Sequence, residues 1–335
     1  MQKQRLLIAA ISGMLCLNLT TGASAQPVQL RTGSFTPPGS PWEAQWLRFK
    51  AKIEKDSTGS LAVDLNMKEP NEATSLGNLR RGRIECSGAS MQGAATIVPE
   101  IAILQAPFLW NDTQELDYVY DKHIRPHLGK LFAAKGVELV QFVDVGWTNV
   151  FGNEPIKSPS DAKGVKLRAS QSQASQMLLK AVGAEVVPMA IGEVVPALQT
   201  GLIKGGESGV VVYSVVMSKV SRNYTLTHHA YDTGVVICNK AWYDKLTPEH
   251  KKIVSAGYGS SEAVRKEVRE FAGRVEESLK EKGVSVYKPS ADEVKQWRSA
   301  TQEVPAQMVK TVGGDAQQLF SEIQTGKNDY AAGKR

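Results

Sequence analysis

The sequence predicts an α/β protein built from two lobes, and three observations lead to this prediction. The chain has 335 residues, which is more than one hydrophobic core usually serves, so two domains are expected. Segments in which apolar and polar residues alternate, as in strands, are followed along the chain by segments of helical periodicity, and this order repeats. This order favours parallel sheets with crossover helices, and it begins a second time after residues 146–160.

Composition and charge are those of an ordinary globular protein. Apolar residues make up 42% of the chain and charged residues 22%. Lysine and arginine exceed aspartate and glutamate by 40 to 34, which gives a formal net charge of +6, but the basic residues form no long run. This spacing predicts a solvated surface and no nucleic-acid partner, while weak attraction to membrane surfaces or anions stays open.

The first 25 residues have the pattern of a secretory signal peptide. Lys3 and Arg5 precede an apolar segment. The small residues Ala23 and Ala25 occupy the two positions before the cleavage site that a signal peptidase recognises. A buried N-terminal helix is the alternative, but the apolar segment is short and ends in a cleavage pattern. We therefore expect a signal peptide over residues 1–25, cleavage after Ala25 and a soluble, exported protein.

The first α/β unit is predicted to extend to residue 147. Trp42, Trp46, Phe49 and Ile53 recur at spacings of 4, 3 and 4, which places them on one face of a helix. Further helices are expected over residues 70–82 and 113–135. Strands are expected where apolar side chains alternate, at residues 28–34, 61–67, 83–90 and 137–147.

The second unit repeats the alternation of strand and helix. A helix is expected after the strand at residues 164–170, with Ser170 or Ser172 as its N-cap and Gly183 at its end. One long helix is predicted over residues 247–283. The remaining predictions are strands at residues 185–189 and 204–214, a short helix at 191–201, two strand-like stretches within 225–246, and short strands and helices after 283.

The cysteines and histidines do not predict a metal site. Cys86 and Cys238 lie in apolar, strand-like segments; export permits a disulfide between them, but we interpret them as two small buried hydrophobic side chains. His228 and His229 are adjacent, so on a strand they point to opposite faces and do not join a ligand set.

No catalytic motif accompanies this architecture. The chain has no nucleophile elbow, no P-loop and no dinucleotide fingerprint after a strand. The glycine-rich segment at residues 205–209 lacks the Lys-Ser/Thr pair that holds a phosphate and magnesium. Two lobes, an export signal and no catalytic motif favour a binding protein. The alternative is an exported hydrolase or isomerase that uses Glu207 or Glu193.

Several segments together resemble a known family. They occur in the family's order and cover nearly the whole chain after residue 25; they read LGNLRRGRIECS, QAPFLWND, PIKSPSDAKGVKLRAS, LLKAVGAEVVPMAIGEVVPALQTGLIKGGES and CNKAWYDKLTPEHKKIV. In this the chain resembles the DctP-type solute-binding proteins of TRAP transporters, the periplasmic receptors of sodium-coupled, ATP-independent uptake systems.

The resemblance implies a periplasmic-binding-protein-like fold. Two α/β lobes would enclose a ligand cleft, with crossing strands and one long helix spanning both lobes. Lobe I would comprise residues 26–145 plus about 233–265, and lobe II residues 146–232 plus about 266–335. The resemblance also implies a monomeric periplasmic receptor that binds a small organic acid, delivers it to a membrane permease, and needs neither a cofactor nor a metal.

Arg168 is the strongest candidate ligand contact. It ends an alternating segment just before a predicted helix, and ligands in open α/β sheets bind at the carboxyl ends of strands. An arginine chosen at random would more often lie in an exposed ion pair. The resemblance implies instead that Arg168 binds the ligand carboxylate, for which the flat, two-pronged guanidinium is the matching donor.

The chain departs from the family pattern around this arginine. Where many relatives carry a second arginine, it has Trp147 and Thr148, and Lys204 and Ser208 replace an aspartate and an Asn or Trp. One arginine neutralises one carboxylate well, and a buried second carboxylate without a partner is costly. We therefore expect a monocarboxylate with an apolar or aromatic body.

The remaining site residues are expected around the same ligand. Trp147 either packs in the core or forms a flat wall of the cleft, while Thr148, Ser208 and Tyr213 offer hydroxyl groups. Glu207 is the alternative holder of a bridging cation, but the departure at Ser208 argues against a metal.

Overall fold

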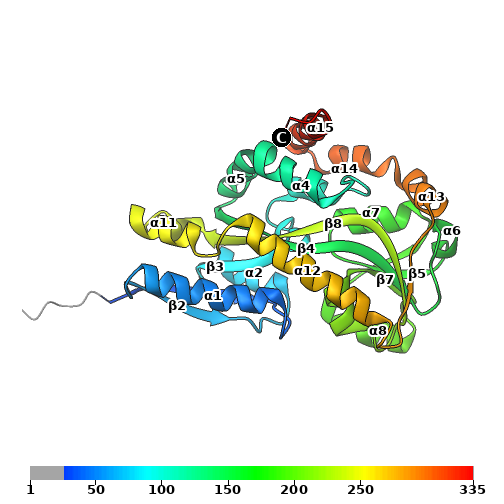
Figure 1. The fold of residues 1–335 in the computed structure, drawn as a ribbon, viewed down its shortest axis with the longest axis horizontal. Helices are drawn as coiled ribbons and strands as arrows, with labels where there is room; N and C mark the ends of the chain where they lie inside the picture. The colour runs from blue at the N-terminus through cyan, green and yellow to red at the C-terminus, as the bar shows by residue number, and fades with distance from the viewer. Residues whose placement is uncertain (1–25, 335) are drawn as a thin grey trace, which may run out of the picture.

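The computed structural model describes residues 26–334 and shows a two-lobed α/β protein in which one mixed sheet passes through both lobes (Figure 1). The predicted signal peptide, residues 1–25, lies outside the described residues. The sheet has nine strands in the order β2-β1-β3-β8-β4-β7-β5-β6, with β9 paired to β8. The strands are β1 (Val28–Ser34), β2 (Leu61–Asn66), β3 (Cys86–Ser90), β4 (Val137–Gly152), β5 (Lys166–Ala169), β6 (Glu185–Pro188), β7 (Gly205–Gly209), β8 (Asn223–Asn239) and β9 (Ser285–Tyr287).

Each lobe contains a set of three parallel strands. In lobe I, β1 lies between β2 and β3, and in lobe II, β5 lies between β6 and β7. The two long strands β4 and β8 connect these sets and run antiparallel to each other. β3 pairs with the second half of β8, whereas β7 pairs with the second half of β4, so both long strands belong to both lobes.

The passage from one lobe to the other coincides with an irregular register between β4 and β8. Register shifts occur at Leu139/Gln141, Asp144/Gly146 and Thr148/Val150. Gly146 has a φ of +116°, a backbone conformation that a residue with a side chain rarely adopts. The predicted lobe boundaries at 145/146 and 232/233 stay predictions, and this irregular segment lies beside them.

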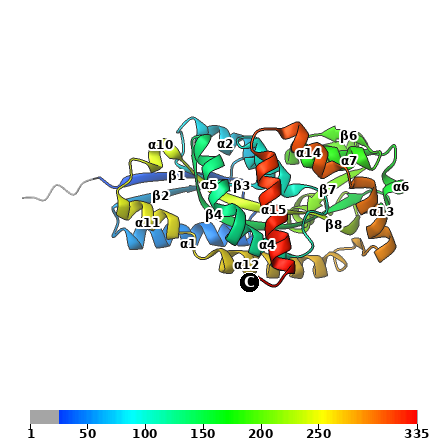
Figure 2. The ribbon, with the colours of Figure 1, turned by 90° about the horizontal axis from the view of Figure 1, so that it is seen from above.

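Helices cover both faces of the sheet (Figure 2). The α-helices are α1 (Pro41–Asp56), α2 (Glu72–Arg80), α3 (Met91–Ala94), α4 (Thr113–Val119), α5 (Arg125–Ala134), α6 (Pro159–Ala162), α7 (Gln173–Ala181), α8 (Val194–Thr200), α9 (Val210–Val212), α10 (Lys240–Tyr243), α11 (Pro248–Ala256), α12 (Ser261–Leu279), α13 (Ala291–Thr301), α14 (Val304–Val312) and α15 (Ala316–Ala331). Shorter turns of other types are η1 (Pro99–Gln105), η2 (Tyr120–Ile124), η3 (Ile191–Glu193) and η4 (Tyr213–Met217). Among residues 26–334, no helix is long and apolar enough to cross a membrane.

Most predicted elements are present, and the exceptions have physical causes. The predicted strand at 204–214 ends at Gly209, after which the chain turns into α9 and η4. The two strand-like stretches after residue 225 are one strand, β8, interrupted only by the left-handed backbone of His228. The predicted helix 247–283 is two helices, because Gly259 has a φ of +91°, which a helix does not allow, and Ser260 caps the start of α12.

α12 is the helix that spans both lobes. It runs from α1 in lobe I past β4 to α9 in lobe II (Figure 1). Arg269 on α12 binds both oxygens of Asp117 on α4 at 2.7 Å, and its Nε donates to the fully buried Asp144 of β4 at 2.6 Å. The Tyr231 hydroxyl donates to the same Asp144 oxygen at 2.6 Å. This cluster, the α12 ion network, ties the spanning helix to β4 near the irregular register.

The C-terminal helices contact elements of both predicted lobes, and their assignment to lobe II stays a prediction. Residues 266–335 were expected in lobe II. In the structure α15 packs against α4, η1 and η2, which belong to the segment expected in lobe I, and α14 contacts both η1 and α7. The end of the chain therefore returns across the boundary between the lobes.

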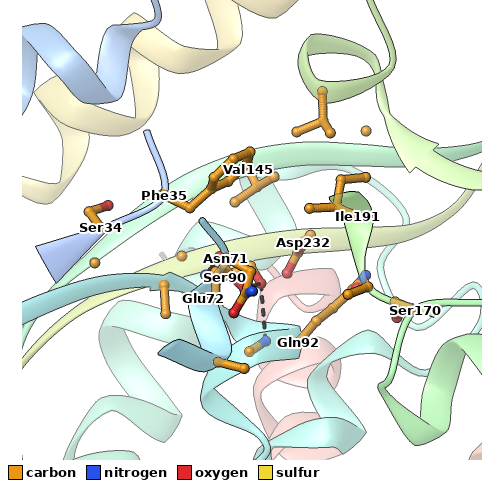
Figure 3. Close-up of a pocket in the computed structure, with 18 of the residues that line it drawn as sticks. Ser34, Phe35, Asn71, Glu72, Ser90, Gln92, Val145, Ser170, Ile191 and Asp232 are labelled. Atoms are coloured by element: carbon orange, nitrogen blue, oxygen red, sulfur yellow. Dashed lines mark hydrogen bonds between the residues drawn. The ribbon is translucent and has the colours of Figure 1, made fainter. Parts of the chain in front are cut away.

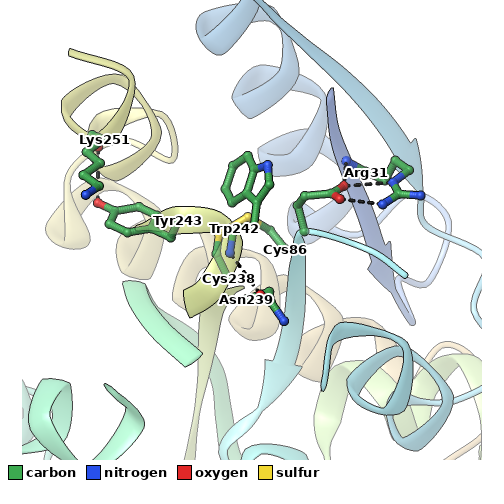
Figure 4. Close-up of a disulfide and its surroundings, with 8 residues drawn as sticks. Arg31, Cys86, Cys238, Asn239, Trp242, Tyr243 and Lys251 are labelled. Carbon is green, nitrogen blue, oxygen red and sulfur yellow. Dashed lines mark hydrogen bonds and ion pairs between the residues drawn. A yellow bond between two sulfur atoms is a disulfide. The ribbon is translucent and has the colours of Figure 1, made fainter. Parts of the chain in front are cut away.

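The interpretation of the two cysteines as free buried side chains was wrong. Cys86 and Cys238 form a disulfide that joins β3 to β8 within lobe I (Figure 4). They stand directly opposite each other in the antiparallel register, with their Cα atoms 4.0 Å apart. Pairing across adjacent strands, invisible in the sequence, brings the two sulfur atoms together.

Candidate functional site: a cleft between the lobes

A cavity of about 710 Å³ lies between the two lobes (Figure 3). Lobe I contributes residues at the ends of β1 and β3 and the start of α2, among them Phe35, Glu72 and Ser90. Lobe II contributes residues at the ends of β5 and β6 and along β7, among them Arg168 and Ile191. The carboxyl ends of both parallel sets therefore face one cavity, the location at which open α/β sheets bind ligands.

Arg168 lines this cavity and is fixed in place by the backbone. Its side chain leaves β5; Nε donates to the carbonyl of Met189 and Nη1 to the carbonyl of Glu207, both at 3.3 Å. The residue is only 8% exposed, so the exposed ion pair considered as the alternative is excluded. Burial lowers the pKa of the Arg168 guanidinium, while the nearby Glu207 carboxylate acts in the opposite direction.

Glu207 lies beside Arg168 and is held by two other side chains. The Ser175 hydroxyl on α7 donates to its Oε1 at 2.6 Å, and Nε2 of His229 on β8 lies 3.4 Å from its Oε2. Burial by itself would raise the pKa of Glu207, but the contact with His229 and the charge of Arg168 bring that pKa below its usual range. Glu207 is therefore an anion near Arg168, and its charge offsets part of the charge of the guanidinium.

The other predicted site residues divide into two groups. Thr148 and Ser208 line the cavity with Arg168 and Glu207. Trp147 and Tyr213 do not: Trp147 stacks on His228 and packs edge-on against Tyr231, and the Tyr213 hydroxyl donates to the carbonyl of Ser221 at 2.6 Å. Of the two alternatives for Trp147, the structure shows packing.

The apolar walls come from residues that the sequence assigned to other roles. Trp42 was expected on the packed face of α1, yet it lines the cavity, and its Nε1 donates to the carbonyl of Asp144 at 2.9 Å. Phe35, Val145 and Ile191 form further apolar surface. Trp42 was detectable as a helix-face aromatic near the N-terminus of α1, but only the fold shows that this end of the helix faces the cavity.

Two carboxyl groups that line the cavity were also missed. Glu72, at the start of α2, accepts hydrogen bonds from the backbone NH and the hydroxyl of Ser90, both at 2.7 Å. Asp232 on β8 accepts one from Nε2 of Gln105 at 2.6 Å. Figure 3 shows both carboxyls in one part of the cavity, which we call the acidic end. Neither has an ion-pair partner within residues 26–334, and no sequence motif marks them.

The site contains no cluster suited to a metal ion. Within the described part of the chain, no three or more His, Cys, Asp or Glu residues come together in a way that would hold one. Glu207 directs its oxygens to Ser175 and His229, as described above. The geometry thus supplies a charged anchor, apolar walls and an acidic end.

The fold and this cavity define a two-lobed solute-binding protein. The family model for bacterial extracellular solute-binding proteins of family 7, DctP, matches residues 32–311. The chain belongs to this family, and the resemblance to the DctP-type proteins of TRAP transporters is confirmed.

Individual relatives cover most of the chain. It is 30% identical over 244 residues to the 2,3-diketo-L-gulonate-binding periplasmic protein YiaO of Escherichia coli, a match that covers 71% of this chain and 74% of that protein. It is 24% identical over 322 residues to the C4-dicarboxylate-binding periplasmic protein DctP of Rhodobacter capsulatus, covering 93% and 96%. The structure of the sugar acid binding protein DctPAm of Advenella mimigardefordensis with galactonate superposes with a TM-score of 0.83 at 24% identity, covering 90% and 99%.

Proposed function

We propose that the protein is the periplasmic receptor of a TRAP transporter, that it binds a small organic acid through a single carboxylate at Arg168, and that it delivers this acid to a membrane permease. The observation that carries the proposal is the position of Arg168. Among the described residues that line the cavity, it is the one cationic side chain. This buried guanidinium donates to backbone carbonyls and forms no direct ion pair with a described side chain, so it gains most from a ligand that brings a carboxylate into contact with it.

The rest of the cavity supports a ligand with one carboxylate. Arg31 and Lys204, the other basic residues near the expected site, do not line it, and Arg31 is bound to Glu85 at 2.6 Å (Figure 4). Trp42 and Phe35 offer flat apolar surface to a ligand body. The names of YiaO and of the galactonate complex describe sugar acids, each with one carboxylate, whereas that of the R. capsulatus protein describes dicarboxylates.

Binding and release would follow from movement of the lobes. A ligand that contacts both walls stabilises a closed form, in which water is excluded and the contact with Arg168 strengthens. The permease would recognise that closed form. Cleavage after Ala25 would place the receptor in the periplasm, so mass spectrometry of the exported protein is expected to show Gln26 as the first residue.

The enzyme alternative has less support. Glu207 is held by Ser175 and His229, and Oε2 of Glu193 accepts from the backbone NH of Ala190 at 2.8 Å, so both candidate carboxylates serve the local structure. The relatives reported above are binding proteins. We expect an acid that stabilises the protein to be recovered unchanged after incubation, and a converted acid would support the enzyme instead.

The test of the proposal is the affinity of Arg168 variants. A thermal-shift screen with galactonate, branched and aromatic monocarboxylates, succinate and malate first identifies an acid that binds. In calorimetry with that acid, Arg168→Ala is expected to lose about 2–5 kcal/mol, which is tens- to thousands-fold in affinity. Arg168→Lys should recover only part, because an ammonium group lacks the two-pronged geometry.

Arg31→Ala is the matched control for this experiment. It removes an arginine of lobe I whose partner is Glu85, outside the cavity, and is expected to leave the affinity unchanged. Binding of the acid by Arg168→Ala with the affinity of the unmodified protein would contradict the proposal. Tight binding of succinate or malate without binding of any monocarboxylate would contradict the single-carboxylate part.

A further inference from the structure

The charges of the cavity wall are unlike those expected for a site that binds only an anion. The titratable carboxyls of the described lining are Glu72, Glu193, Glu207 and Asp232, against the single guanidinium of Arg168. The carboxylate of Glu207 is near Arg168 and offsets part of its charge without a direct ion pair. Glu193 is exposed and caps the start of η3. The acidic end, Glu72 and Asp232, has no counterion among residues 26–334.

The acidic end is held by neutral donors only. Glu72 is bound by the backbone and hydroxyl of Ser90, and Asp232 by the amide of Gln105. Asp232 is 5% exposed, so its charge has little water to solvate it. Neutral donors orient a carboxyl group, but they do not compensate a buried negative charge as a cation does.

The two carboxyls are close enough to affect each other. Burial, together with the nearby carboxylates of Glu72 and Glu207, raises the pKa of Asp232 well above its usual range. Burial also raises the pKa of Glu72, and the hydrogen bonds from Ser90 offset only part of this. In the empty cavity the acidic end therefore tends to keep a proton, and a cation placed there would release it.

We propose that the cavity takes a zwitterion, with its carboxylate at Arg168 and a protonated nitrogen between Glu72 and Asp232. This proposal rests on the proposed function, because it assumes a carboxylate at Arg168, and it specifies the chemistry of the other end of the ligand. A second carboxylate would meet the buried Asp232 and the half-buried Glu72 and be repelled. A hydroxyl group would be accepted as a hydrogen-bond donor, but it would not neutralise the acidic end.

The test uses straight-chain acids of increasing length that differ only in the terminal group: amino, hydroxyl or carboxyl. Calorimetry at neutral pH is expected to give the highest affinity for an amino acid of matching length, a lower affinity for the hydroxy acid, and the lowest for the dicarboxylate. Binding of the amino acid should release protons, seen as a dependence of the measured heat on the ionisation enthalpy of the buffer. The hydroxy acid should release none.

Variants of the acidic end separate this proposal from a general preference for amines. Glu72→Gln and Asp232→Asn each remove the negative charge and keep one oxygen as a hydrogen-bond acceptor. Each is expected to weaken binding of the amino acid about tenfold or more, with little change for the hydroxy acid. Glu154→Gln, which removes an exposed carboxyl away from the cavity, is the control and should change neither affinity.

The outcomes distinguish this inference from the proposed function. The zwitterion proposal is overturned if the hydroxy acid or the dicarboxylate binds as tightly as the amino acid. It is also overturned if both acidic-end variants keep the preference for the amino group. In both cases Arg168 stays the residue that binds the carboxylate. If no acid of the series binds, or if Arg168→Ala binds all of them unchanged, the proposed function fails as well.

Discussion

Arg168 and Glu207 show how single residues prepare the cleft. The guanidinium is oriented by two backbone carbonyls, which cannot move away from it as side chains can. Glu207 is oriented in turn by Ser175 and His229. A ligand carboxylate then meets a donor that is already in position, so little conformational freedom is lost on binding.

Asp232 gives a prediction about pH that needs no ligand. Its folded pKa lies above the value of about 3.9 for an unfolded chain. The folded protein therefore holds a proton that the unfolded chain releases, and stability falls as the pH rises from about 4 through the folded pKa. Asp232→Asn removes this loss and still accepts from Gln105, so it should stabilise the protein more at pH 8 than at pH 5.

The measurement is urea unfolding of the ligand-free protein at these two pH values, compared between the variant and the unmodified protein. Glu154→Gln serves again as the control for removal of a carboxyl. The same difference in unfolding free energy at both pH values would show that Asp232 is not the group responsible.

At the residue level the sequence predicts the anchor of the site better than its surroundings. Arg168 and Glu207 lie in segments with a recognisable order, so their place at the cavity could be expected. Glu72 and Asp232 carry no such mark, because the start of α2 and the strand β8 come together at the cavity only in the folded chain. Trp147 and Tyr213 do not line the cavity although neighbouring residues do, because Trp147 packs against His228 and Tyr231, and Tyr213 stacks on Tyr224.

At the level of elements, α12 is held by charges as well as by packing. Asp144 is fully buried, and removal of Arg269 would leave this carboxylate with only the Tyr231 hydroxyl as a strong partner. Breaking a buried pair in this way costs about 3–5 kcal/mol. Arg269→Ala is therefore expected to lower the unfolding free energy by about 3 kcal/mol or more, measured by urea unfolding.

Lys266 on the same helix provides the matched comparison. Its ion pair with Glu270 joins two exposed side chains 3.9 Å apart, and such pairs contribute at most about 1 kcal/mol. Lys266→Ala should therefore have a small effect. Equal effects of the two variants would mean that the α12 ion network does not stabilise the position of the spanning helix.

The elements themselves were largely predictable because their periodicity and caps are local. β1 has the predicted bounds, and Ser172, one of two candidate caps, accepts from the backbone NH of Ser175 at 3.2 Å. The errors arise where tertiary contacts decide. The β-branched residues after Gly209 favour a strand locally, yet they form the short helix α9. The break before α12 lies at Gly259, whose left-handed backbone interrupts an otherwise helical pattern.

At the level of the whole molecule, the two lobes share β4 and β8, while the disulfide lies within lobe I alone. Its cysteines are 152 residues apart, and closing a loop of that size stabilises a folded chain by about 5 kcal/mol when only chain entropy is counted. The double variant Cys86→Ala, Cys238→Ala should therefore lower the melting temperature. Since neither cysteine lines the cavity, the affinity for a bound acid should change less than about threefold.

The comparison requires calorimetry below the melting temperature of the variant, so that only folded protein is titrated. The unmodified protein treated with a reducing agent is the second arm and should match the variant. A large loss of affinity with an unchanged melting temperature would show that the bond controls the cleft and does not stabilise the fold.

The disulfide also makes a covalent ring of everything between Cys86 and Cys238. This ring contains β4, all the strands of lobe II's parallel set and Arg168, while β1, β2, α12 and the C-terminal helices lie on the two arms outside it. A protease that cuts once inside the ring produces two fragments that stay linked until the bond is reduced. A cut on either arm releases a fragment at once. Comparing reduced and non-reduced electrophoresis after limited digestion therefore shows which part of the chain was opened.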